Sequence, residues 1–166
     1  MAYKLIEGGG VTTPKGFLAG ACYVGVKSRK SEKPDVAIIY SEQPASCAAM
    51  FTTNKFCAAP VILDREILKK GKARAVVINS GNANAATGEQ GIKDAKTVET
   101  EAEKLLGLGE DEVFVCSTGV IGQKLPVEKV LEGVRRIVPD MSVEKGTDAA
   151  WAIMTTDLVK KEVAYE

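Results

Sequence analysis

The chain has 166 residues and no histidine, and its 22 lysine and arginine residues balance 22 aspartate and glutamate residues. This length and an apolar share of 45% suit one domain with a buried core, and the balanced charge argues against a nucleic-acid partner. The longest apolar stretches have the length of strands, so no segment is predicted to cross a membrane. The N-terminus lacks the apolar core of a signal peptide, and we expect a cytoplasmic protein.

The missing histidine and the four scattered cysteines exclude several kinds of site. No Ser-His-Asp triad, Cys-His pair or histidine base can be built from this chain alone. Cys22, Cys47, Cys57 and Cys116 form no CxxC pair, so no metal site is expected, and their apolar neighbours favour reduced core residues. Acyl-transfer chemistry would therefore need another base, such as an amine, or residues from another chain.

The first half of the chain predicts an antiparallel sheet. After a glycine-rich turn over residues 8–16, strands are expected over residues 17–27, 36–40 and 47–52, with a charged loop over 28–35. Because no helix separates these strands, they should form an antiparallel meander. The polar residues 52–55 would then be either a solvated strand end or the rim of a site.

Helices and strands alternate in the second half. Proline positions and apolar residues at steps of three or four predict helices over residues 60–70, 91–106, 126–138 and 144–154. Strands are expected over 75–79, from residue 113, and again from residue 158. The fold class is therefore α/β, with layered sheets and helices and the meander in the N-terminal half.

Two polar segments follow the predicted strands of this half. Residues 80–88 are rich in glycine and asparagine, and Asn82 and Asn84 could cap a helix, brace neighbouring loops or touch a ligand; bracing is favoured. The strand from residue 113 leads into Ser117, Thr118 and Gly119, where small residues allow a sharp turn with bare N–H groups. Such groups can hold the negative oxygen of acyl transfer, although a structural turn explains the same pattern.

A threonine pair ends the last predicted helix. Thr155 and Thr156 could bond the local backbone, as threonines at helix ends commonly do. Alternatively, they place a hydroxyl at the mouth of a pocket.

Five segments together resemble the ornithine acetyltransferase family, the bifunctional glutamate N-acetyltransferases. They are residues 9–17, 50–56, 77–85 (containing Asn-Ser-Gly-Asn-Ala-Asn), 117–122 (Ser-Thr-Gly-Val-Ile-Gly) and 153–157. The segments lie in the family's order across almost the whole chain. The resemblance implies the self-cleaving fold that this family shares with related aminopeptidases.

The resemblance further implies an enzyme of arginine synthesis that moves an acetyl group from N2-acetylornithine to glutamate. In the family, a precursor cuts itself, and the new N-terminal threonine of the β chain is the nucleophile, with its own amine as base. The self-cleavage motif is absent here, so residues 1–166 are expected to be most of the α chain, inactive alone. Two α and two β chains form the expected heterotetramer. No cofactor is implied, and the use of acetyl-coenzyme A as a second donor stays open.

Matched to the family's motifs, Thr118 and Gly119 take the place of the oxyanion-hole pair. Thr155 takes the place of a substrate-binding threonine, with Thr156 as the alternative in a register shifted by one. Two other functions are kept open: a related self-cleaving aminopeptidase-type hydrolase, and a structural subunit without catalytic residues.

Overall fold

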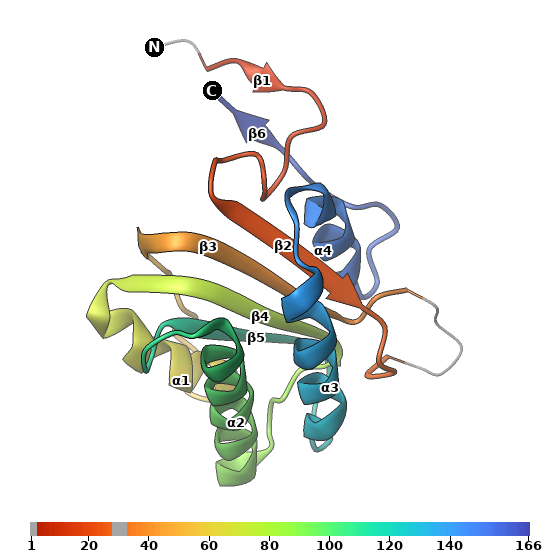
Figure 1. Cartoon of the computed structure of the whole chain (residues 1–166). Helices are drawn as coiled ribbons and strands as arrows, with labels where there is room; N and C mark the ends of the chain where they lie inside the picture. Colours follow the sequence, from red (N-terminus) through yellow and green to blue (C-terminus); the bar gives the residue numbers. More distant parts are fainter. Residues whose placement is uncertain (1–2, 28–32) are drawn as a thin grey trace.

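A four-stranded sheet is the main element of the computed structural model, which describes residues 3–27 and 33–166 (Figure 1). Of the expected loop 28–35, residues 28–32 lie outside the described part. The strand order is β2-β3-β4-β5, with β2 (Phe17–Cys22), β3 (Val36–Ser46), β4 (Lys72–Asn82) and β5 (Val113–Val120). The first three strands are antiparallel, and β4 and β5 are parallel.

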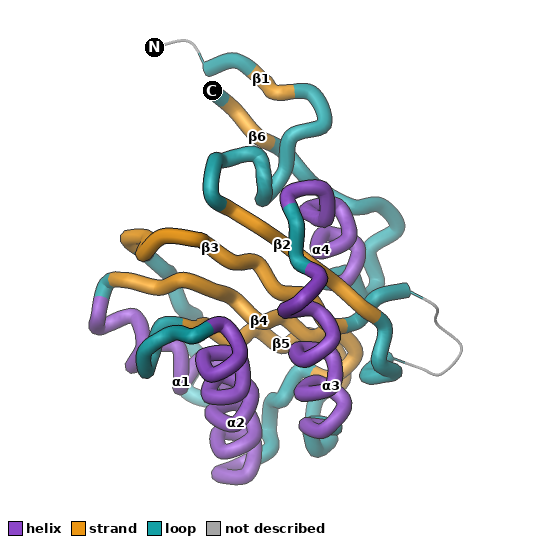
Figure 2. The backbone as a smooth tube through the Cα atoms, in the orientation of Figure 1, coloured by secondary structure: helices purple, strands orange, loops and turns teal. Residues whose placement is uncertain are grey.

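Helices cover the two faces of this sheet unequally. They are α1 (Ala59–Ile67), α2 (Gly88–Leu106), α3 (Val127–Ile137) and α4 (Gly146–Ala152), with 3-10 turns at Leu68–Lys70, Val138–Asp140 and Val143–Lys145. Figure 2 shows α2 and α3 side by side across the strands, and they bury alternate strand residues such as Val36, Val77 and Val115. On the other face, Ala149 and Ala152 of α4 cover only the β2–β3 half.

The other half of that second face is what we call the open face, formed by Val76, Phe114 and Cys116, with Ile39 at its border packed against the α4 cluster. These side chains alternate with the buried ones along their strands, yet none of them is fully buried. The main core therefore lies on the side of α2 and α3, and an apolar part of the sheet is left uncovered.

The expected antiparallel meander is present, but its third strand was assigned wrongly. Residues 47–52 form no strand, and the third strand is β4, which follows α1. Both edges of β3 are already paired, with β2 and β4, so the segment after β3 finds no free edge beside it. Met50 is fully exposed there, and the polar residues 52–55 are exposed as well.

The four predicted helices are confirmed to within a few residues, α4 being preceded by the 3-10 turn Val143–Lys145. The strand expected from residue 158 is only β6 (Ala164–Tyr165), which pairs with β1 (Leu5–Ile6) in a separate ribbon (Figure 1). No helix in the described part of the chain combines the length and the apolar character needed to span a bilayer.

The cysteines are free, as expected, and of the four Cys22 packs against the main core. Cys22, Cys47 and Cys57 are half-buried, and Cys116 is exposed on the open face. The prediction of a core position was therefore wrong for Cys116, because its strand places every second side chain on the open face. Cys47 and Cys57 lie outside the helices and strands. Burial of the Cys22 thiol against the core raises its pKa to about 11, which keeps it protonated and unreactive.

Candidate functional site

A pocket of about 460 Å³ lies at the ends of β4 and β5, and we call it the strand-end pocket. It is lined by Lys27, Gly81, Thr118, Gly119, Val120, Thr155 and Thr156. Because β4 and β5 run in parallel, their last residues meet at one edge of the sheet, and the chain after α4 borders the same place. The structure thus brings Thr118, Gly119 and Thr155 together from distant parts of the sequence, and Thr156 beside them.

Two glycines allow the backbones around this pocket to come unusually close. Gly119 has a φ of +135°, and a Cβ placed there would lie 2.4 Å from the carbonyl carbon of Gly81. Gly81 has a φ of +110°, and its Cβ would lie 2.7 Å from the backbone nitrogen of Lys27. Neither the conformation nor the space admits a side chain, so these positions need glycine. Three chain segments are therefore stacked backbone against backbone at the pocket.

The direction of the β5 backbone bears on which N–H groups are free. The Val115 N–H points away from β4 and donates to Asp64 Oδ1 at 3.0 Å, whereas the Val120 carbonyl accepts from Ala83 on the β4 side. Successive N–H groups of a strand alternate between the two sides, so the Gly119 N–H is expected on the outer side, unused by β4. The Thr118 side chain shares the open face with Cys116. A carbonyl oxygen held beside these two residues could receive hydrogen bonds as it becomes negative.

Asparagines behind the pocket hold its loops in place. Ser117 Oγ donates to Asn79 Oδ1 at 2.6 Å, and Asn79 Nδ2 donates to the Asn82 carbonyl at 2.8 Å. Asn82 Nδ2 donates to the carbonyls of Gln123 and Lys124 at 3.2 and 3.1 Å. Asn84 is fully buried, and its Nδ2 donates to the Gly91 carbonyl at 2.8 Å. Of the three roles considered for Asn82 and Asn84, bracing of the loops is the one observed.

The threonine pair is placed by the end of α4. Ala152 and Met154 are buried, which fixes the chain just before the exposed Thr155 and Thr156. The structure gives both threonines a position on the pocket wall, so the register between them stays open.

Lys27 is the pocket residue that the sequence analysis missed. Its Nζ donates to the carbonyls of Pro34 and Ala152 at 2.9 and 3.2 Å, and burial lowers its pKa from the usual range. A single lysine at the end of a predicted strand carries no sequence pattern, and its place depends on contacts with residues 125 positions away.

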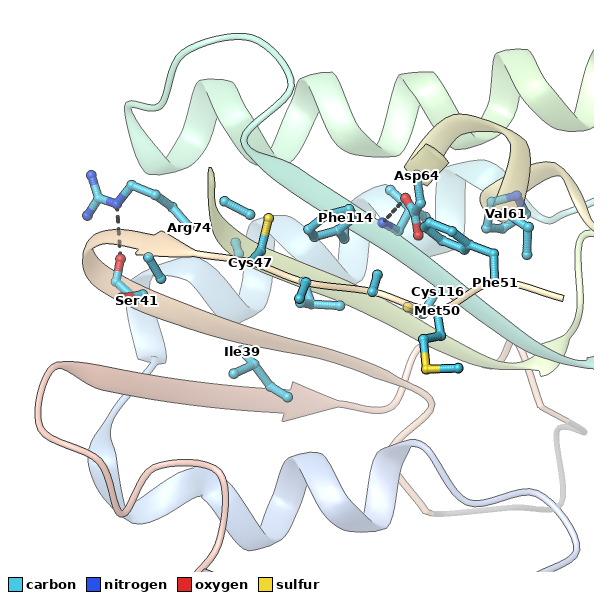
Figure 3. A pocket seen from close by; sticks show the side chains of 18 of the residues that line it. Ile39, Ser41, Cys47, Met50, Phe51, Val61, Asp64, Arg74, Phe114 and Cys116 are labelled. Atoms are coloured by element: carbon cyan, nitrogen blue, oxygen red, sulfur yellow. Dashed lines mark hydrogen bonds between the residues drawn. The ribbon is translucent and has the colours of Figure 1, made fainter. Parts of the chain in front are cut away.

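A larger cavity of about 640 Å³ lies over the open face, and Figure 3 shows its lining from close by. Met50, Phe51, Phe114 and Cys116 give it largely apolar walls, with Asp64 among them. Burial raises the Asp64 pKa to about 7, a shift that can mark a functional carboxyl.

The Asp64 carboxylate already has a structural partner in this cavity. Its bond to the Val115 N–H blocks the free edge of β5, the kind of protection that edge strands need. None of the three predicted site residues lines the cavity. We therefore take the strand-end pocket, with its small residues and hydroxyl groups, as the candidate active site.

Known proteins with similar sequences match this chain over almost its whole length. The arginine biosynthesis bifunctional protein ArgJ of Caldanaerobacter subterraneus subsp. tengcongensis is 54% identical over 158 residues, which are 95% of this chain and 38% of the relative. The ArgJ protein of Dehalococcoides mccartyi is 45% identical over 162 residues, 98% of this chain and 40% of the relative. The chain thus spans about two fifths of the length of the curated relatives that it matches.

Solved structures match over almost the whole chain. The crystal structure of ornithine acetyltransferase from Mycobacterium tuberculosis, complexed with ornithine, has a TM-score of 0.90 and 42% identity, covering 99% of this chain and 88% of that chain. The argJ protein of Bacillus halodurans also has a TM-score of 0.90, with 38% identity and coverage of 99% and 85%. The mixed α/β fold is thereby confirmed, and the ArgJ family matches residues 18–166. On these matches, the chain belongs to the ArgJ family.

Proposed function

We propose that residues 1–166 are most of the α subunit of an acetyltransferase that moves acetyl from N2-acetylornithine to glutamate. The observation that carries the proposal is the strand-end pocket, which gathers Thr118, Gly119 and Thr155 in a chain of the ArgJ family. The relative solved with ornithine supports the class of substrate. Residues 118 and 119 would hold the oxyanion, and Thr155, or Thr156 in the shifted register, would contact the substrate.

In the proposed reaction, the nucleophile is the N-terminal threonine of a partner β chain. Its hydroxyl attacks the acetyl carbonyl while its own amine takes the proton, and Thr118 and Gly119 donate to the developing oxyanion. Ornithine leaves with a proton on its amine, and the glutamate amine then attacks the acetyl-threonine to give N-acetylglutamate. The composition of the pocket supports a nucleophile from outside, because Lys27 is the one ionisable residue among its described lining residues and already donates to two carbonyls.

The surface of the chain supports a large partner. Phe114 and Cys116 lie on the open face, and Met50, Phe56 and Ile121 are 100%, 75% and 66% exposed. Met50, Phe114 and Cys116 line one cavity, and exposed apolar surface gathered in one place marks an interaction site. The chain covers 38% of a curated relative but 88% of a solved chain, which supports a precursor divided into two parts. We propose that the β part covers the open face and that two copies of each chain assemble.

The test uses the complete protein that contains this chain. Incubation with N-acetylornithine should release ornithine in amounts that depend on added glutamate, and a denaturing gel should resolve two chains. Release at the same rate without glutamate would instead assign the related hydrolase activity. A single uncut chain that still transfers acetyl groups would contradict the proposed mechanism.

Two further measurements decide the remaining parts of the proposal. Adding acetyl-coenzyme A in place of N-acetylornithine tests whether glutamate is acetylated from this second donor. A double replacement of Thr118 and Gly119 that keeps full activity would assign the chain a structural role.

A further inference from the structure

One backbone carbonyl, that of Ala152 at the end of α4, accepts hydrogen bonds from two side chains of other elements. Ser80 Oγ of β4 donates to it, and Lys27 Nζ donates at 3.2 Å. Ala152 is three residues before Thr155, and both Ala152 and Met154 are buried. We propose that Lys27 is a positioning residue that sets the distance between the two walls of the strand-end pocket, an inference that rests on the proposed function.

The backbone segment that carries Lys27 is itself held in place by hydrogen bonds. Its backbone N–H donates to Asp35 Oδ2 at 3.0 Å, and the Val24 N–H donates to Asp35 Oδ1 at 2.8 Å. Asp35 is fully buried, so these bonds are shielded from water. The loop that carries Lys27 is thus held to the start of β3 before its side chain extends to α4.

Lys27 touches both walls of the pocket through different atoms. Its backbone nitrogen would lie 2.7 Å from a Cβ on Gly81, and Gly81 in turn meets Gly119 just as closely. Its ammonium group holds the Ala152 carbonyl, and through it the chain leading to Thr155. One residue therefore spans from the wall with Thr118 and Gly119 to the wall with the threonine pair.

The chemistry of this contact fits a holding role. An ammonium group has three donors, and the carbonyls of Pro34 and Ala152 take two of them. Charge-assisted bonds of this kind are stronger than bonds between neutral groups, and burial strengthens them further. The side chain joins the connection between β2 and β3, which contains both Lys27 and Pro34, to the end of α4. Its loss should therefore loosen the Thr155 wall specifically.

The variant Lys27→Met, made in the complete protein, keeps the unbranched side chain up to the position of Cε and removes its donors. Hydrogen exchange followed by mass spectrometry should show faster exchange in the peptide that covers residues 153–157. In ornithine release, the KM for N-acetylornithine should rise about tenfold while kcat changes less than about threefold, as expected for one lost charge-assisted bond on a binding wall. Lys27→Arg keeps a donor and should restore most of the affinity.

A double-mutant cycle separates positioning from general damage. If Lys27 acts through Thr155, Lys27→Met should raise KM little further in a Thr155→Ala background. Lys129→Met is the matched control, because Lys129 Nζ of α3 donates at 2.7 Å to the Gly25 carbonyl, which lies in the same loop as Lys27 and not in α4. It should lower thermal stability but leave KM and the exchange of residues 153–157 unchanged.

Each outcome decides something. Unchanged exchange at residues 153–157, additive effects with Thr155→Ala, or an equal rise in KM in Lys129→Met would overturn the positioning role. If the unmodified protein releases no ornithine, the proposed function is refuted. Faster exchange at residues 153–157 in Lys27→Met would then leave the positioning role standing. If Lys27→Met does not assemble, Ser80→Ala removes the other donor to the same carbonyl and should speed the same exchange; unchanged exchange there refutes the inference.

Discussion

Replacing Gly119 by alanine tests the closest backbone approach at the candidate active site. The added Cβ would lie 2.4 Å from the Gly81 carbonyl carbon and 2.6 Å from the Asn82 nitrogen, whereas ordinary contact begins at 3.4 Å. The strand β5 must therefore move about 1 Å away from β4, or Gly119 must leave its φ of +135°. A non-glycine residue in such a conformation also costs about 1–3 kcal/mol.

A displacement of this size at the groups that hold the oxyanion should slow the chemistry strongly. Misplacing a catalytic group by ~1 Å can cost about 10²-fold in rate. We therefore expect Gly119→Ala to lower kcat for ornithine release by about 10²-fold, with a smaller change in KM. The assay is the initial rate of ornithine release by the complete protein, alongside its thermal unfolding midpoint.

Gly122→Ala is the matched control, two residues past the end of β5. Gly122 also has a positive φ, +77°, but a Cβ there would meet nothing within 4 Å. This variant adds backbone strain of roughly 1–2 kcal/mol without a clash, so its kcat should stay close to that of the unmodified protein. A Gly119→Ala enzyme with normal kcat would refute the reasoning, and equal losses in both variants would attribute the effect to strain alone.

Three other predictions follow from the same structure. Thr118→Ala should lower kcat by ~10²–10³-fold with little change in KM, because the hydroxyl is expected to donate to the oxyanion; an unchanged kcat would exclude that role. Burial raises the Glu99 pKa to about 7 from 4.5, so the folded state binds its proton more tightly than the unfolded state does. Stability should therefore fall as pH rises from about 4.5 to about 7, and Glu99→Gln should reduce this slope in urea unfolding measured across that range; an unchanged slope would place the pH dependence elsewhere. Asn84→Ala removes the side-chain bond to Gly91 and should lower the free energy of unfolding by about 1–3 kcal/mol in the same assay, and a variant as stable as the parent would contradict its bracing role.

The helices could be predicted because their signal is local. The apolar residues of α2 and α3 recur at helical spacing, and residues such as Val98 and Val134 do lie in the core. The strand predicted over residues 47–52 failed for a reason that no local pattern contains. Its apolar residues resemble a strand, but β3 has no free edge, and Met50 lies in solvent. Strand propensity depends on neighbours that the sequence does not identify.

The candidate site was partly predictable for a similar reason. Thr118, Gly119 and Thr155 lie in short motifs that the resemblance could match one by one, and the structure gathers them in one pocket. Lys27 lies in no such motif, and its role arises from tertiary contacts with α4 and Gly81. Position 81 likewise needs glycine because the backbone of Val26 and Lys27 lies against it, and this contact cannot be read from residues 80–88 alone.

The small ribbon of β1 and β6 has a consequence for the order of folding. Its strands have two residues each, and backbone bonds between Lys4 and Glu166 extend it by one pair across a sequence separation of 162 residues. So few contacts gain little against the entropy of closing so long a loop. We expect the ribbon to form after the main sheet and to open before it, so that β1 and β6 separate and rejoin while the pocket stays folded.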